Sequence, residues 1–248
     1  NNVVSIAVSA RPPSSDMITP NHPVPEPIWA RANAVMRSIG GGSHNSPTGA
    51  PPVQAAPCPE VEVVFARGRT EPPGAGQVGN AFIDALRSKT DKSIGTYAVN
   101  YPADIEVIEG ANDMSKRIQY TAANCPDTTL VLGGYSLGAA VADIVLGAPT
   151  KMFGYNNPLP PAMSDRIAAV ALFGNGTIPF FGPISEISPT YGGKTIDLCT
   201  ATDPICSGNL NPDDIIGDFV GKWSAHQQPA YIDSGLVDEA AAFVAARL

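Results

Sequence analysis

Residues 129–147 read TLVLGGYSLGAAVADIVLG, and this stretch decides the fold. The apolar run over 129–133 predicts a buried parallel strand, and the alanine-rich run over 137–145 predicts a helix that follows it at once. Between them lies the pattern G-x-S-x-G, with Ser136 at its centre. A strand, a tight turn and a helix in this order are typical of a nucleophile elbow. We therefore expect Ser136 to be a nucleophile at a helix N-terminus, where the backbone N–H of Leu137 can donate to an oxyanion.

The chain on either side of this stretch alternates between strand and helix patterns. Further strands are expected over 61–66, 96–100, 167–173 and 194–198, and further helices over 80–88, 112–124 and 234–248. Such alternation implies an α/β fold with a five-stranded, mostly parallel sheet, right-handed crossovers and helices on both faces. The last helix is expected to turn Leu236, Phe243 and Leu248 inward.

Residues 1–57 differ from the rest, because they are rich in proline, glycine, serine and asparagine. Such a composition buries little apolar surface and predicts a flexible extension to a domain over 58–248, or a segment partly packed on that domain. A short strand over 3–9 and a short helix over 28–39 are expected within it. Since the chain starts at Asn1, we expect a mature form whose signal peptide has been removed.

Charge excludes several classes of partner. The net charge is −8 and the sequence pI is about 4.8. An acidic chain without a basic stripe is not expected to bind nucleic acid, and its charge does not favour docking on anionic lipid. No stretch approaches the roughly 18–20 apolar residues of a membrane span.

The four cysteines are Cys58, Cys125, Cys199 and Cys206. An even number suggests disulfides and an oxidising compartment, although four cysteines allow three pairings. A metal site is not expected, because no two of them have the C-x2-C or C-x4-C spacing of zinc ligands.

A serine nucleophile needs a base and an acid. Of the three histidines, only His226 lies in the predicted domain, after the last strand, so it is the expected base. The order serine, acid, histidine places the acid between them. The candidates are Asp165, Glu186, Asp197, Asp203, Asp213, Asp214 and Asp218. We expect Asp203, because it follows the last strand and a disulfide across its loop would hold the carboxylate still.

Three motifs together resemble the cutinase family, in particular the cutinase-like esterases of mycobacteria. They are ARGRTE over 66–71, GYSLGAA over 134–140, and Cys199-x3-Asp203-x2-Cys206 ahead of a single His226. The resemblance spans about 58–248. It implies a small α/β-hydrolase without a large cap domain, and the pairings Cys58–Cys125 and Cys199–Cys206. It also implies hydrolysis of short- to medium-chain acyl esters, or of polyesters such as cutin, without a cofactor.

Three features depart from the family pattern, the first being Leu137, which stands where the family commonly has glutamine. Arg69 stands where the family often has serine or threonine, although its backbone N–H can still join that of Leu137 in an oxyanion hole. The stretch 207–225 is longer than in compact members, and its apolar helical face is expected to flank the cleft and bind the acyl chain. That face contains Ile215, Ile216, Phe219, Val220 and Trp223. Arg67 and Glu71 are expected to form an ion pair or to brace the loop between them.

Other functions stay open at this point. Acetyl xylan esterases, lipases and phospholipases are compatible with the same triad, and a non-catalytic envelope or host-interaction protein could use the same fold. The G-x-G-x-x-G over 74–79 does not favour dinucleotide binding, because its first glycine does not follow the strand directly. The expected protein is a monomer, secreted or associated with the cell envelope.

Overall fold

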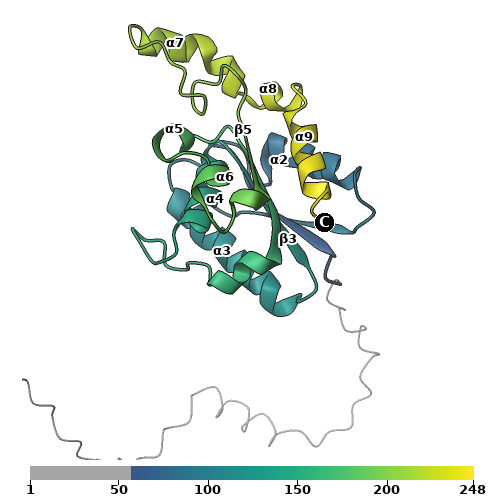
Figure 1. Cartoon of the computed structure of the whole chain (residues 1–248). Coiled ribbons are helices and arrows are strands. Elements are labelled where there is room, and N and C mark those ends of the chain that lie inside the picture. The colour runs from purple at the N-terminus through teal and green to yellow at the C-terminus, as the bar shows by residue number, and fades with distance from the viewer. Residues whose placement is uncertain (1–56) are drawn as a thin grey trace, which may run out of the picture. The chain divides into compact units, whose positions relative to one another are not determined.

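The computed structural model describes residues 57–248 (Figure 1). The strand expected over 3–9, the helix expected over 28–39 and the packing of the extension lie outside the described residues. Within the described part of the chain, no helix has the length and apolar character needed to cross a membrane.

The centre of the domain is a five-stranded parallel sheet, which confirms the predicted α/β class. Its strands are β1 (Val61–Ala66), β2 (Ile94–Ala98), β3 (Thr129–Tyr135), β4 (Ile167–Phe173) and β5 (Thr195–Leu198). Their order across the sheet is β2-β1-β3-β4-β5. After β1 the chain forms β2 on one side of it and then β3 on its other side. The direction in which strands are added to the sheet therefore reverses between β1 and β3. Ligands of open α/β sheets bind at the carboxyl ends of the strands beside such a reversal.

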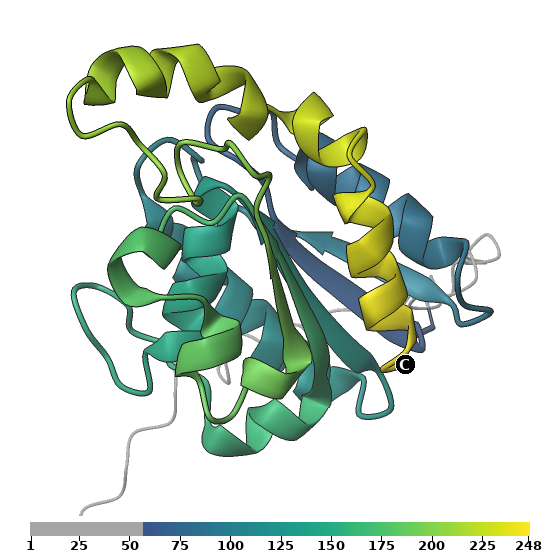
Figure 2. The same ribbon diagram turned by 45° about the horizontal axis from the view of Figure 1, so that its top comes forward.

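Helices cover both faces of the sheet (Figure 2). One face carries α2 (Gly76–Arg87), α8 (Gln228–Ile232) and α9 (Leu236–Ala245), and the other carries α3 (Val107–Asn124), α4 (Leu137–Gly147) and α6 (Ile184–Ile187). The remaining helical turns are η1 (Pro161–Arg166), α5 (Ile178–Phe181), η2 (Gly192–Lys194), α7 (Ile215–Lys222) and η3 (Trp223–His226). In both ribbon views, α7 lies beyond the carboxyl ends of the strands.

The apolar core has two layers, one on each face of the sheet. All six residues of β1 are buried, as expected for a strand covered on both sides. The predicted inward residues of α9, Leu236, Phe243 and Leu248, are half-buried and pack against the core, whereas its fully buried residues, Val237, Ala240, Ala241 and Val244, were not predicted. The small side chains bring α9 close to α2, with the larger ones at the sides of the contact.

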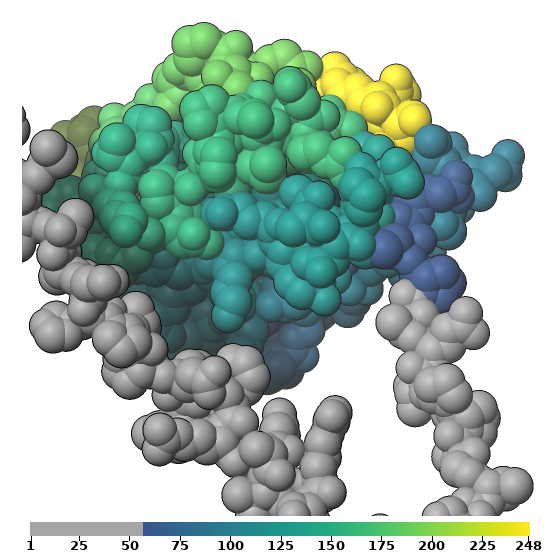
Figure 3. Space-filling view, turned by 90° about the horizontal axis from the view of Figure 1, so that it is seen from below, coloured from purple at the N-terminus to yellow at the C-terminus, as the bar shows by residue number. Residues whose placement is uncertain are grey.

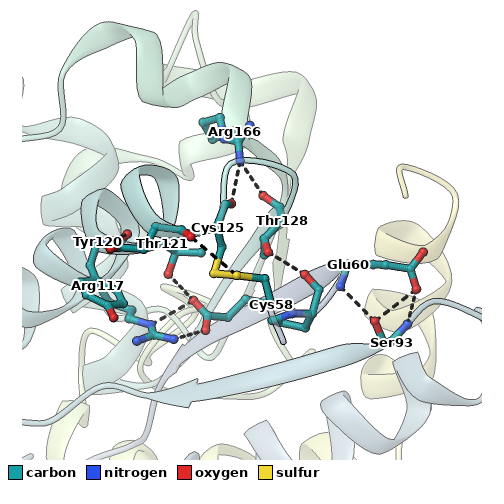
Figure 4. Close-up of a disulfide and its surroundings, with 12 residues drawn as sticks. Cys58, Glu60, Ser93, Arg117, Tyr120, Thr121, Cys125, Thr128 and Arg166 are labelled. Atoms are coloured by element: carbon teal, nitrogen blue, oxygen red, sulfur yellow. Dashed lines mark hydrogen bonds and ion pairs between the residues drawn. A yellow bond between two sulfur atoms is a disulfide. The ribbon is translucent and has the colours of Figure 1, made fainter. Parts of the chain in front are cut away.

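The disulfide Cys58–Cys125 lies at the end of the domain where the strands begin (Figure 4). It joins the residues before β1 to the C-terminal end of α3, as the resemblance implied. Nearby, buried Glu62 pairs with Arg117 and accepts a hydrogen bond from Thr121 at 2.7 Å. Figure 3 shows the molecule from below, with the C-terminal residues in yellow at its rim.

Candidate active site

The G-x-S-x-G turn has a strained backbone that only glycine neighbours permit. Ser136 adopts φ 55° and ψ −115° between the end of β3 and the start of α4. A Cβ on Gly134 would lie 2.2 Å from the carbonyl oxygen of Gly138, and one on Gly138 would lie 1.9 Å from that of Ala66. Both glycines are therefore required for β3, the turn and α4 to pack this closely, and the turn sets Ser136 at the helix N-terminus.

The structure brings Ser136, His226 and Asp203 into one chain of hydrogen bonds. The Oγ of Ser136 lies 2.8 Å from Nε2 of His226, and Nδ1 of His226 lies 2.7 Å from Oδ2 of Asp203. Asp203 is 0% exposed and His226 is 4% exposed. With an ionised Asp203, Nδ1 carries the proton and leaves Nε2 free to accept from the serine. Among the described residues, the other candidate acids make no contact of this kind with His226.

Several donors keep the carboxylate of Asp203 ionised. Its Oδ1 accepts from the backbone N–H of Ile205 at 2.7 Å, and its Oδ2 accepts from the hydroxyl of Tyr231 as well as from His226. Burial alone would raise the pKa of Asp203, but the hydrogen bonds from His226 and Tyr231 outweigh it, so the pKa lies below its usual value. Burial, together with the bond to Asp203, raises the pKa of Tyr231, which therefore stays a donor.

The loops that carry the acid and the histidine are tied to the sheet and to each other. The hydroxyl of Tyr135, inside the serine motif, donates to the backbone carbonyl of His226. The hydroxyl of Thr200 donates to the carbonyl of Ala225 at 2.8 Å. The disulfide Cys199–Cys206 spans the loop that contains Asp203, as the resemblance implied. Because neither sulfur is a free thiolate, the cluster of these cysteines with Asp203 is not a metal site.

Two buried charged residues, Arg67 and Glu71, fix the conformation of the loop after β1 through hydrogen bonds. The carboxylate of Glu71 accepts from the backbone N–H groups of Gly68 at 2.7 Å and Gln77 at 2.8 Å. The guanidinium of Arg67 donates to the carbonyls of Glu71 at 2.8 Å and Tyr101 at 2.7 Å. In the described chain no ion pair joins the two side chains, so the brace prediction is right and the ion-pair alternative is wrong.

Arg69 and Leu137, the two residues predicted to supply an oxyanion hole, line the same pocket as Ser136. Leu137 is the first residue of α4, so its N–H has no acceptor within the helix. Among the described residues, the N–H of Arg69 has no acceptor either. The guanidinium of Arg69 pairs instead with exposed Asp104 at 3.1 Å. Thus Arg69 departs from the family pattern in its side chain but keeps its backbone N–H available as a donor.

These groups line a pocket of about 480 Å³. Part of its wall is apolar and comes from Phe219 of α7, Trp223 of η3 and Ile205. The ring of Trp223 lies 5.2 Å from that of His226. Other apolar side chains of α7 face solvent, with Ile216 80% exposed and Val220 68% exposed. The segment 207–225 thus flanks the pocket.

Sequence reasoning missed two contributors to the site, Tyr231 and Tyr135, and one half-buried acid beside it on α4, Asp143. The single acidic residue in the apolar run of α4 was a signal for Asp143, which accepts from Asn175 at 2.8 Å and from Thr177. The two tyrosines gave no signal, because their hydroxyl partners lie far away in the sequence.

Comparisons with known proteins show the family of the chain. A family model described as Cutinase matches residues 57–248. The probable carboxylesterase Culp2 of Mycobacterium tuberculosis is 56% identical over 193 residues, covering 78% of this chain and 81% of the relative. The phospholipase Culp4 of the same organism is 51% identical over 207 residues, covering 82% and 84%. The solved structure of Trichoderma reesei cutinase in complex with a C11Y4 phosphonate inhibitor is similar at 30% identity and a TM-score of 0.55, covering 76% of each chain. The chain belongs to the cutinase family.

Proposed function

We propose that this protein hydrolyses carboxylic esters through an acyl-enzyme on Ser136, with His226 as base and Asp203 as the acid that orients it. The family and the relatives named carboxylesterases make the chain a carboxylic ester hydrolase. The observation that carries the mechanism is the continuous chain of hydrogen bonds, 2.8 Å and 2.7 Å long, at the base of a partly apolar pocket.

In the acylation step, the Oγ of Ser136 attacks the ester carbonyl carbon and its proton passes to Nε2 of His226. The resulting oxyanion accepts hydrogen bonds from the backbone N–H groups of Leu137 and Arg69. The intermediate then collapses: the bond from carbon to the alcohol oxygen breaks, and His226 donates its proton to the leaving alcohol. Asp203 holds the imidazole in the required tautomer and stabilises its cationic form.

In the deacylation step, His226 takes a proton from water, and the hydroxide oxygen attacks the acyl carbon. The same two N–H groups hold the second oxyanion. Collapse releases the carboxylic acid and returns the proton to Ser136, so one ester and one water give one acid and one alcohol.

The substrates we propose are short- to medium-chain acyl esters, including polyesters such as cutin. The apolar wall formed by Phe219 and Trp223 supports an acyl chain in the pocket. A phospholipid ester is a second candidate, because a relative named a phospholipase is 51% identical and because α7 presents exposed Ile216 and Val220 beside the site. The two disulfides support action in an oxidising compartment, outside the cytoplasm.

We also propose residues 58–248 as the catalytic domain and residues 1–57 as an extension to it, since the family match begins at residue 57.

The test is hydrolysis of p-nitrophenyl butyrate by the wild type, by Ser136→Ala and by the control Ser88→Ala, which removes a hydroxyl at the end of α2. We expect kcat to fall by roughly 10⁴- to 10⁶-fold in Ser136→Ala, because a triad without its nucleophile loses the acyl-enzyme route. The control should keep wild-type activity. Equal activity in both variants would overturn the proposal.

A further inference from the structure

A second cavity, of about 490 Å³, lies on the α3–α4 face of the sheet. Its walls are the start of α3, the outer side of α4, the segment 152–153, and the turns α5 and α6. It is separate from the pocket that contains Ser136, and the mechanism above does not use it.

The second cavity adjoins the pocket of the triad at Ala140. Ala140 lines both, and Gly176 of the first pocket is followed in the chain by Thr177 of the second. Ala140 lies one helical turn, about 6 Å, along α4 from Ser136. From Ala140 to Gly147, which also lines the second cavity, the helix continues for about 10 Å. The cavity therefore begins beside the nucleophile and runs away from it along α4.

The lining suits a hydrocarbon. It is formed almost entirely by carbon atoms, with Asp143 as its one ionisable residue and with no lysine or arginine among the described side chains. The carboxylate of Asp143 would repel an anionic ligand such as a free fatty acid. At the rim, Phe153 is 90% exposed and Phe181 is 73% exposed, and a bound hydrocarbon would remove part of this apolar surface from water.

We propose that the second cavity binds the hydrocarbon chain of a long-chain ester whose carbonyl group lies against Ser136. This inference rests on the proposed function of Ser136 and names a substrate class for it. A butyryl group ends within the first pocket, whereas a palmitoyl chain passes Ala140 and follows α4. Each further methylene that enters the cavity raises kcat/KM, because its burial is favourable in the transition state as well as in the bound substrate.

The experiment fills the cavity at Gly147, where a Cβ would meet no atom within 4 Å. The variant Gly147→Phe is compared with Gly193→Phe, a matched control at a second glycine with equally open surroundings, just before β5. The readout is kcat/KM for p-nitrophenyl palmitate divided by that for p-nitrophenyl butyrate, measured on the full chain. We expect the ratio to fall by about tenfold or more in Gly147→Phe and to stay unchanged in the control. An unchanged ratio in both would overturn the inference.

A binding measurement separates this inference from the proposed function. A neutral pyrenedecanoyl ester is titrated into Ser136→Ala with and without Gly147→Phe, so that no hydrolysis is involved. We expect affinity to fall by about tenfold when the cavity is filled. Retained affinity would contradict the cavity as the binding site, even in a protein that hydrolyses esters. Conversely, a wild type without esterase activity would refute the proposed function alone. If Gly147→Phe does not fold, Ile144→Trp fills the same cavity from one turn higher on α4.

Discussion

Asp203 is fully buried, yet three donors surround its carboxylate: Nδ1 of His226, the hydroxyl of Tyr231 and the N–H of Ile205. A buried charge is tolerated only with such partners, since transfer from water without them is costly. Because the pKa of Asp203 is lowered, its ionised form stabilises the folded state above the ordinary aspartate pKa, and this stabilisation is lost as the pH falls through the lowered value.

Tyr231→Phe tests the role of one donor. We expect the free energy of unfolding to fall by about 1 to 3 kcal/mol at neutral pH, because a buried acceptor loses a partner. With one donor fewer, Asp203 binds a proton more readily, so the loss of kcat on the acid side of the pH profile moves to higher pH.

The control for this prediction is Tyr155→Phe, which changes another fully buried tyrosine on the opposite face of the sheet. Both variants are compared by urea denaturation and by kcat from pH 4 to 9. A profile that moves equally in both, or in neither, would show that Tyr231 only fills space.

Which residues could be found from the sequence depends on how local their signals are. Ser136 follows from its motif, His226 from elimination among three histidines, and Asp203 from its position between two cysteines. Tyr231 could not be found, because its hydroxyl meets Asp203 only after β4, β5 and α8 are in place. The brace by Arg67 was expected, but its use of backbone carbonyls depends on how the loop closes.

At the scale of elements, the segment α7–η3 has two kinds of apolar residue. Phe219 and Trp223 line the pocket, whereas Ile216 and Val220 face solvent. The N-terminal end of α7 is capped by Asp214, which accepts from Gly217 at 3.0 Å. The helix thus presents one face to the pocket and leaves the other exposed to solvent.

Truncating one residue of each kind separates the two faces. We expect Phe219→Ala to lower kcat/KM for p-nitrophenyl octanoate by about tenfold, because the pocket loses an apolar wall, whereas Ile216→Ala should leave it within about twofold. For both variants, hydrolysis of monomeric p-nitrophenyl octanoate is compared with hydrolysis of p-nitrophenyl acetate. If long- and short-chain rates fell equally in Phe219→Ala, the segment would not bind the acyl chain.

The two disulfides are expected to have different roles. Cys58–Cys125 closes a long loop with a sequence separation of 67, whereas Cys199–Cys206 closes one of 7. Chain-entropy estimates give losses on replacement by serine of about 4 and about 2 kcal/mol. We expect replacement of Cys199–Cys206 to lower kcat more than replacement of Cys58–Cys125 does, although it costs less stability. The reason is that only Cys199–Cys206 holds the loop of Asp203. The opposite ranking in kcat would contradict this assignment.

The strands and the long helices were predictable, whereas the short helical turns were not. The strands β1 and β4 match their predicted bounds, whereas β2 begins two residues before the predicted start. The turns α5, α6 and α8 have four or five residues each, too few to show helical periodicity. In α9, the residues predicted to face inward do pack on the core, but the fully buried alanines were missed, because a small side chain gives little apolar signal.

At the scale of the whole molecule, the buried Asp203 and the half-buried Asp143 respond to pH in opposite directions. Burial raises the pKa of Asp143 to about 6, helped by nearby Asp197 and opposed by the hydrogen bonds from Thr177 and Asn175. The folded state therefore holds this proton more tightly than the unfolded state does. As the pH rises from the ordinary aspartate pKa of about 3.9 to about 6, Asp143 lowers the free energy of unfolding, whereas Asp203 raises it over its own acidic range.

Asp143→Asn isolates this contribution. The amide keeps an oxygen that can accept from Thr177 and Asn175, and its nitrogen replaces Oδ1, which has no partner among the described residues. We expect the variant to gain stability relative to the wild type as the pH rises from 4 to 7, measured by urea denaturation at each pH. A difference that stays constant over this range would contradict the raised pKa.

The central claim is that Ser136 is the nucleophile of an ester-hydrolysing triad. The most direct measurement is covalent labelling with diethyl p-nitrophenyl phosphate, whose tetrahedral phosphorus resembles the acylation intermediate, followed by peptide mass spectrometry. The account predicts one diethylphosphoryl group on Ser136, one p-nitrophenolate released per protein, loss of esterase activity in step with labelling, and no comparable label in His226→Ala. A label on a different residue, or esterase activity that survives complete labelling of Ser136, would contradict it.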